Sequence, residues 1–399
     1  MTKKATLTRQ EVKILVITII VAACSMLGID IHLASMPHIM RYLHTDKTHM
    51  QQSVSIYLLG MGASLFFYGP LSDRYGRKPI VIFGLSLAAL ASYGTMFTHT
   101  IVMFLFTRLI QGVGSSVCIG VVRTIIVDVL KKRTALYASY FTMFLGLSPL
   151  LAPAIGGYIQ HGFDWQANFF VLGSVIALAL FVYTVFCPET NHYKNPDACK
   201  IKTIYQNYTF LLCHKVFIGC TLLAGIVMAA NMAYATTSSF ILQTQFNLTP
   251  IIYGWTTSIV GIGTIIGKFI TPTIIHRFGQ PKTVITGLVL LLIAGLWLVL
   301  FILFRSINVP LIMIAVIATL LAQAFVGPTI GSAALTPFHD KRGAAGAFYG
   351  GFQLLVTFLG SAIIGSFAHD GIWVLAIAYT VLGLLGLIIY RYAVINSFD

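Results

Sequence analysis

The chain has 399 residues, of which 57% are hydrophobic and only 9% are charged. A typical soluble domain is about 25% charged, and no soluble fold of this length could bury so much apolar surface. The composition therefore excludes a soluble protein and predicts an integral membrane protein. The formal net charge of +14 comes from basic residues between apolar runs, so it gives no reason to expect binding to nucleic acid.

Twelve apolar runs are each long enough to cross a membrane, for which a helix needs about 20 mostly apolar residues. The runs are continuous and lack the alternating pattern of outer-membrane strands, so we predict an all-α membrane protein. They cover residues 12–34, 52–72, 79–97, 102–126, 136–160, 166–187, 214–239, 250–274, 283–304, 310–333, 343–368 and 372–394.

Lysine and arginine gather in every second loop, which marks the cytoplasmic side of a membrane protein. We therefore expect both termini in the cytoplasm. The N-terminal segment and the alternate loops hold Lys3, Lys4, Arg9, Lys13, Arg74, Arg77, Lys78, Lys131, Lys132, Arg133, Lys194, Lys200, Lys202, Lys215, Arg277, Lys282, Lys341 and Arg342. The intervening loops hold only Arg41, Lys47 and Arg305.

A polar stretch in the middle of the chain separates six runs from six. We expect an N-terminal bundle at 1–187, a cytoplasmic linker at 188–213 and a C-terminal bundle at 214–399. Internal repetition supports this division, because the segment from Gly69 to Gly76 has a weaker copy from Pro272 to Gly279, about 203 residues later. Such repeats predict two pseudo-symmetric six-helix bundles with a binding site between them near the membrane midplane.

A short charged turn, Gly69 to Lys78, joins the second and third runs. Its two glycines allow a sharp reversal, and its aspartate can accept hydrogen bonds from helix N-termini or arginines. With two charged residues at the inner end of the fourth run, it predicts a cytoplasmic gate. The alternative is an ordinary turn that only anchors the topology. The gate residues are Gly69, Asp73, Arg74, Gly76, Arg77, Arg123 and Asp128.

Ionisable residues inside membrane spans are costly and usually face a cavity, a partner or a substrate path. Asp30 and Arg108 fall at similar depth in the first and fourth runs, so they can form one charged centre. Burial favours the protonated carboxyl group, whereas a nearby arginine favours the ionised one. Moving a cation toward or away from Asp30 would therefore change its proton affinity, as proton exchange requires. The alternative is a buried pair with a structural role only.

The fifth run contains two prolines and a pair of glycines. Proline removes a backbone donor and bends a helix, while glycines let a neighbouring helix approach closely. This pattern suits a hinge, and a static kink is the alternative. The hinge residues are Pro149, Pro153, Gly156 and Gly157.

Aromatic and polar residues on the central runs are candidates for the lining of a substrate cavity. The alternative for each is packing against other helices or lipid. These candidates are Tyr57, Tyr140, Phe144, Asn231, Tyr234, Phe348, Tyr349, Phe352 and Gln353.

The sequence contains no motif that is typical of an enzyme. No Ser/His/Asp arrangement, phosphate-binding glycine loop or metal-ligand spacing occurs at a plausible site, so we expect no enzyme, no ATP-driven pump, no cofactor and no metal. The cysteine spacings fit no zinc or redox motif, and no disulfide is expected.

Several segments together resemble the twelve-helix drug:proton antiporters of the major facilitator superfamily, particularly the bicyclomycin-resistance (Bcr/CflA) branch. The charged turn resembles the superfamily motif between helices 2 and 3. The other segments are Asp30 with Pro37, Arg108…Gln111-Gly112…Gly114, Arg123-Thr124-Ile125-Ile126-Val127-Asp128 and Pro153…Gly156-Gly157. One departure is Ala152, where the family typically has glycine before the proline.

This resemblance implies a proton-coupled exporter of small amphipathic molecules in the bacterial inner membrane, working as a monomer by alternating access. Asp30 would be the proton site and Arg108 its tuning partner. Proton-coupled carriers of a specific metabolite or siderophore share the fold and remain an alternative. A non-transporting membrane receptor or scaffold is the alternative of another class.

Overall fold

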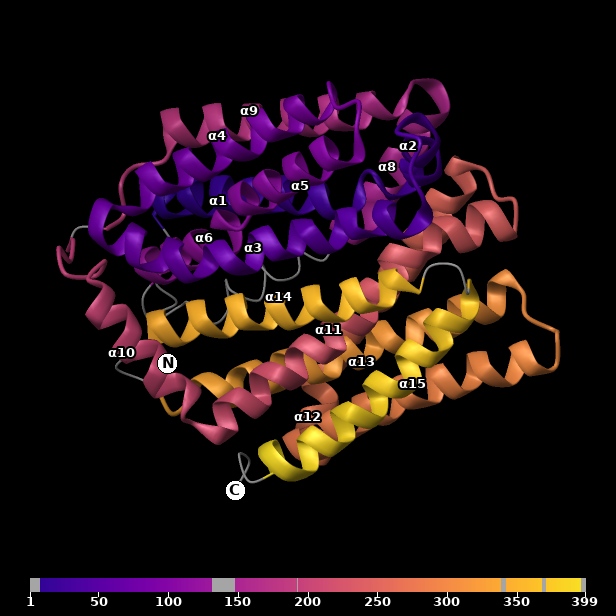
Figure 1. Cartoon of the computed structure of the whole chain (residues 1–399). Coiled ribbons are helices and arrows are strands. Elements are labelled where there is room, and N and C mark those ends of the chain that lie inside the picture. Colours follow the sequence, from indigo (N-terminus) through magenta and orange to yellow (C-terminus); the bar gives the residue numbers. More distant parts are fainter. Residues whose placement is uncertain (1–7, 131–147, 192, 339–341, 368–370, 396–399) are drawn as a thin grey trace.

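Two bundles of long helices lie side by side in the computed structural model, which describes residues 8–130, 148–191, 193–338, 342–367 and 371–395 (Figure 1). The first bundle contains α1 (Arg9–Asp30), the 3₁₀ turn η1 (Leu33–Ser35), α2 (Met36–Tyr42), α3 (Lys47–Tyr75), α4 (Arg77–Thr95), α5 (Ile101–Ser115), α6 (Val117–Leu130), α8 (Ser148–Gly162) and α9 (Trp165–Phe186). The second contains α11 (Lys215–Phe240), the π-helix η3 (Ile241–Gln245), α12 (Pro250–Leu303), α13 (Val309–Leu335), α14 (Arg342–Ser366), α15 (Ile372–Ile389) and the π-helix η6 (Tyr390–Val394). Between the bundles runs α10 (Ile201–Leu212), at the end of the molecule where α1 begins and η6 ends (Figure 1).

The prediction of an all-α membrane protein is confirmed, since the described ranges contain helices and no strand. Ten of their helical stretches are long and apolar enough to span a membrane. One of these, Pro250–Leu303, has 54 residues. A helix of that length would measure about 81 Å, against a hydrocarbon core of about 30 Å. The stretch bends at Gly279 and makes two passes.

The predicted span 136–160 lies partly within residues 131–147, which fall outside the described chain. Its remainder forms α8, whose 15 residues are too few to count as a span alone. With α8 and with two passes in α12, the arrangement agrees with twelve predicted spans.

The two turns of the predicted repeat share one backbone geometry. Gly76, between α3 and α4, has φ 111° and ψ 159°. Its counterpart Gly279 has φ 81° and ψ 166°. Glycine reaches such positive φ values without steric cost, whereas other residues rarely do. The repeat is therefore visible in the backbone as well as in the sequence.

Three expected boundaries differ from the observed ones. The first run was expected to end at residue 34. In the structure α1 ends at Asp30, and the chain continues through η1 into a further helix, α2. Pro37 stands in the first turn of α2, where its missing N–H costs nothing. The fourth run is interrupted at Ser116, which caps α5 and whose hydroxyl bonds to Ser64 Oγ at 2.5 Å. The polar linker contains α10, which the run of polar residues did not predict.

The two bundles meet along small residues. On the α3–α14 contact, Ser55 and Ser361 join their hydroxyls at 2.8 Å. On the α8–α12 contact, a Cβ placed on Gly157 would lie only 2.4 Å from the carbonyl oxygen of Pro250. Close approach of backbones through small residues is how helices associate in a membrane.

We predict that Gly156→Ala destabilises the fold. A Cβ at this position would lie 1.9 Å from the carbonyl oxygen of Ile31, a backbone atom that cannot turn away. Overpacking of this kind costs about 1–3 kcal/mol. The matched control is Gly162→Ala in the same helix, where a Cβ would meet nothing within 4 Å. Melting temperatures of the purified proteins in one detergent should fall for the first variant only, and an equal fall in both would contradict this account of the packing.

The two ends of the second pass of α12 offer a test of the topology. Lys282 and Arg305 are both exposed, and the distribution of basic residues puts only Lys282 on the cytoplasmic side. In a background without the native cysteines, Lys282→Cys should react with an impermeant maleimide only after cell disruption. Arg305→Cys should react in intact cells. Labelling of Lys282→Cys from outside would overturn the proposed orientation.

Candidate functional site

A fully buried arginine occupies the centre of the first bundle. Arg108 lies on α5 with 0% of its surface exposed. Its Nη1 donates to the carbonyl oxygen of Gly28 at 3.0 Å and to Oε1 of Gln111. The guanidinium lies over the Tyr57 ring, 4.4 Å from the centroid, in a cation–π contact. A buried cation thus has a carbonyl, an amide and an aromatic face as its ligands.

Glycines on two helices bring these ligands together. A Cβ on Gly60 of α3 would lie 2.3 Å from the carbonyl oxygen of Leu109, and one on Gly112 of α5 would lie 2.1 Å from that of Tyr57. The two backbones therefore touch at both positions. This contact presses Tyr57 against Arg108.

Asp30 ends α1 close to this cation. It is 9% exposed and within electrostatic reach of Arg108, but no ion pair or hydrogen bond joins its carboxyl group to any residue of the described chain. Tyr253, fully buried on α12 of the second bundle, lies within electrostatic reach of Asp30 as well. The structure thus places Asp30 and Arg108 in one region without pairing them directly.

His32 also belongs to this region, although the sequence argument did not single it out. It is 0% exposed, and neither ring nitrogen has a hydrogen-bond partner among the described residues. Its ring lies 5.9 Å from that of Phe169. The signal was available in the sequence, because a second titratable residue two positions after Asp30 inside an apolar run is unusual.

At the other end of the bundle, Arg77 is the centre of the charged turn. Its Nη1 bonds to Oδ1 of Asp73 at 2.5 Å and its Nε to Oδ2 of Asp128 at 3.2 Å. Arg74, by contrast, is exposed and stacks on the Tyr75 ring at 5.2 Å. These contacts tie α3, α4 and α6 together within the first bundle, at the end predicted to face the cytoplasm. The side chain of Arg123 lies outside what the structure describes.

The segment after α9 completes the turn. Glu189 accepts hydrogen bonds from the backbone nitrogens of Arg77 and Lys78, at 2.9 and 3.1 Å. A carboxylate is stabilised at a helix N-terminus, here that of α4, by the unpaired N–H groups and the helix dipole. The side-chain nitrogen of Asn191 donates to the carbonyl oxygens of Ser72 and Asp73. Sequence reasoning missed both residues because they lie more than 100 positions from the turn.

The remaining gate and hinge residues make contacts with other helices. Gly69 faces Ala347 of α14, whose Cβ would be 3.5 Å from a Cβ on the glycine. In α8, Pro153 is buried and Pro149 exposed. The carbonyl oxygen of Pro153 lies against Gly254 of α12, where a Cβ would be 2.5 Å away. The hinge in α8 stays a prediction.

The candidates for the substrate cavity fall into three groups. Tyr57 lies under Arg108, as described above. Asn231 bonds to Gln323 at 2.6 Å, Tyr234 to Thr257 at 3.3 Å, and Gln353 contacts Met228, all within the second bundle. The third group lies on α14, toward the end of the second bundle that is predicted to face the cytoplasm. There the rings of Phe348 and Phe352 stack with their centroids 5.6 Å apart, and Tyr349 is buried. Tyr140 and Phe144 lie outside the described residues.

A polytopic helical protein with two repeated bundles and ionisable residues buried in one of them has the architecture of a secondary transporter. The family model of the Major Facilitator Superfamily matches residues 18–241 and 220–396, so the chain belongs to this superfamily.

Known relatives and structures agree with this assignment. The chain is 28% identical to the multidrug resistance protein MdtL of Shewanella oneidensis over 362 residues, 89% of each chain. It is 25% identical to a bicyclomycin resistance protein homolog of Haemophilus influenzae over 274 residues, 68% of this chain and 69% of the relative. The crystal structure of a D-xylose-proton symporter superposes with a TM-score of 0.78, at 15% identity, over 96% of this chain and 98% of that one. This last likeness concerns the fold alone.

We predict that Arg77→Gln loosens the inner end of the first bundle. The change leaves the partly buried carboxylates of Asp73 and Asp128 without their shared cation, at a cost of about 1 kcal/mol for such partly exposed pairs. The melting temperature should fall, and cysteines placed on α6 should become more accessible. Arg74→Gln is the matched control, because it removes the same charge from an exposed side chain. If the two variants behave alike, Arg77 does not hold these helices together.

Proposed function

We propose that this protein is a proton-coupled exporter of small amphipathic molecules of the multidrug efflux type. We place it in the bacterial inner membrane as a monomer with both termini in the cytoplasm. Membership of the superfamily, the multidrug and bicyclomycin resistance names of its relatives and the alternation of basic loops support this proposal.

The observation that carries the proposal is a buried carboxyl group beside a buried cation with no bond between them. A purely structural ion pair needs direct contact, because attraction offsets the cost of desolvating both charges only at short range. Asp30 makes no ion pair in the described structure, while Arg108 has other ligands. Asp30 is therefore available to take up and release a proton, and Arg108 sets the field in which it does so.

Alternating access would act on Asp30 through the second bundle. Near this site, the side chain of Gln243 in the middle of η3 donates to the carbonyl oxygen of Ala34 at 3.0 Å, across the two bundles. The pair Trp255 and Tyr158 makes a similar cross-bundle bond at 3.0 Å. Parting of these contacts would open Asp30 to the outer side. The cluster of Asp73, Arg77 and Asp128 would hold the inner ends of the first bundle during the same movement.

The test is transport by the full chain in proteoliposomes under an imposed pH gradient. The panel contains lipophilic cations, neutral antibiotics and metabolites. The parent protein should move one or more amphipathic compounds against protons. Movement of a single metabolite only would favour a specific carrier, and no movement of any compound would favour a receptor or scaffold.

We predict that Asp30→Asn abolishes transport driven by the pH gradient, because the amide keeps the shape of the carboxyl group and cannot titrate. The variant should still fold and bind substrate. Asp30→Glu should keep some coupling. His32→Gln tests the other titratable residue of the region and should leave coupling in place. Asp30→Asn with an unchanged pH dependence would remove Asp30 from the mechanism, and loss of coupling in His32→Gln instead would assign the proton to the histidine.

A further inference from the structure

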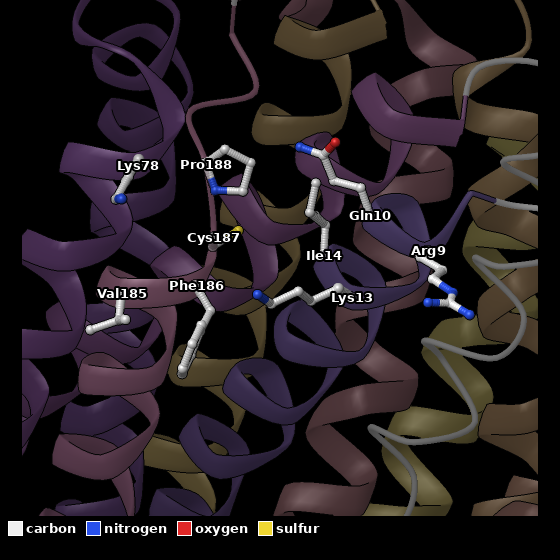
Figure 2. A pocket seen from close by; sticks show the side chains of 9 residues that line it. All are labelled: Arg9, Gln10, Lys13, Ile14, Lys78, Val185, Phe186, Cys187 and Pro188. Carbon is white, nitrogen blue, oxygen red and sulfur yellow. The ribbon is translucent and has the colours of Figure 1, made fainter.

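A cavity of about 470 Å³ lies away from the candidate transport site, at the predicted cytoplasmic end of the first bundle. It is bounded by the start of α1, the start of α4 and the end of α9, and Figure 2 shows the side chains that line it. This volume is in the range of small-molecule sites, about 300–1,000 Å³. None of the residues assigned to transport or gating lines it.

Three cations contribute to the wall of this cavity, namely Arg9, Lys13 and Lys78. None of them forms an ion pair with an acidic residue of the described chain. Two acidic residues of the adjoining segments are bonded elsewhere. Glu11 closes the capping box of α1 with Thr8, and Glu189 accepts from the backbone at the start of α4. No acidic residue lines the cavity, and the Glu189 carboxylate at the backbone of Lys78 offsets only part of its positive charge.

The other wall is apolar and continues along the membrane face of the bundle. Val185 and Phe186 line the cavity, and the Lys13 ammonium lies 4.5 Å from the centre of the Phe186 ring (Figure 2). From Val185 an exposed apolar stripe runs back along α9 through Phe181 and Leu178, which are 62% and 63% exposed. In a membrane this stripe meets acyl chains, so a lipid lying on it would carry its headgroup to the cations.

We propose that this cavity binds the phosphate headgroup of an anionic phospholipid of the inner leaflet. The site requires the cytoplasmic orientation given under the proposed function, but not its transport activity. Basic pockets between helices on the cytoplasmic side attract acidic headgroups, and lysine or arginine at the surface adds to that attraction. A soluble phosphate would use the same cations, but it would gain nothing from the apolar stripe on α9.

The test measures lipid bound to the purified full-length protein by native mass spectrometry. Phosphatidylglycerol and the zwitterionic phosphatidylethanolamine are added in equal amounts, and inorganic phosphate is added alone in a separate arm. The parent should retain phosphatidylglycerol in preference. In the double variant Lys13→Gln/Lys78→Gln the preference should fall by about thirtyfold, as expected for the loss of two surface cations at about 1 kcal/mol each.

The matched control is Lys202→Gln/Lys282→Gln, which removes two exposed lysines on the same side of the molecule but outside the cavity. It should keep the preference, as should Lys13→Arg/Lys78→Arg. A double glutamine variant that retains phosphatidylglycerol like the parent would overturn the proposal. So would tight binding of inorganic phosphate without a preference between the lipids, which would assign the cavity to a soluble anion. Because binding is measured without transport, a failure here is distinct from a failure of the proposed function.

Discussion

The burial of one guanidinium group is the constraint on which the first bundle depends. A cation removed from water must find other ligands, and in a membrane protein these can come only from neighbouring helices. For Arg108 they come from α1 and α3 as well as from its own helix. The ring of Tyr57 reaches it because the backbones of α3 and α5 touch, which glycine at positions 60 and 112 permits. The packing of three helices thus follows from the demands of one charge.

The two turns of the repeat share their backbone geometry but differ in their charged residues. Gly76 and Gly279 impose the same reversal on the two halves. Only the first half adds the carboxylate–arginine cluster, because the second has His276 where the first has Asp73. The turn itself therefore serves the insertion and reversal of the chain in both halves. The ion pairs around Arg77 are an addition, and they lie in the half that also holds Asp30.

The sequence was sufficient to predict the helical spans of the described chain and to place Asp30 and Arg108 in one region, because hydropathy and a constant rise per residue determine both. It could not determine which groups these charges would contact. The depths of Asp30 and Arg108 suggested a pair, but the direction in which a side chain leaves its helix depends on lateral packing. In the structure the guanidinium of Arg108 contacts the carbonyl oxygen of Gly28 and the ring of Tyr57, and not the expected carboxyl group of Asp30.

Glu189 was missed for a related reason. Its role depends on the linker folding back onto a turn that lies more than 100 residues earlier in the chain. The residues next to Glu189 in the sequence do not predict such a contact. The helix α10 was missed although its signal is local, because Ile201, Ile204, Tyr205, Tyr208 and Leu211 recur at the spacing of an amphipathic helix within the otherwise polar linker.

The distribution of ion pairs bears on how the two bundles could move. Every ion pair of the described chain lies within the first bundle or the linker. The contacts between the bundles are made by small residues, by single hydrogen bonds such as that between Ser55 and Ser361, and by aromatic pairs such as Phe66 and Phe348. Breaking a buried ion pair leaves an uncompensated charge, whereas separating small residues does not. No ion pair of the described chain therefore has to break for one bundle to rock against the other, and the ligands of Arg108 named above all belong to the first bundle.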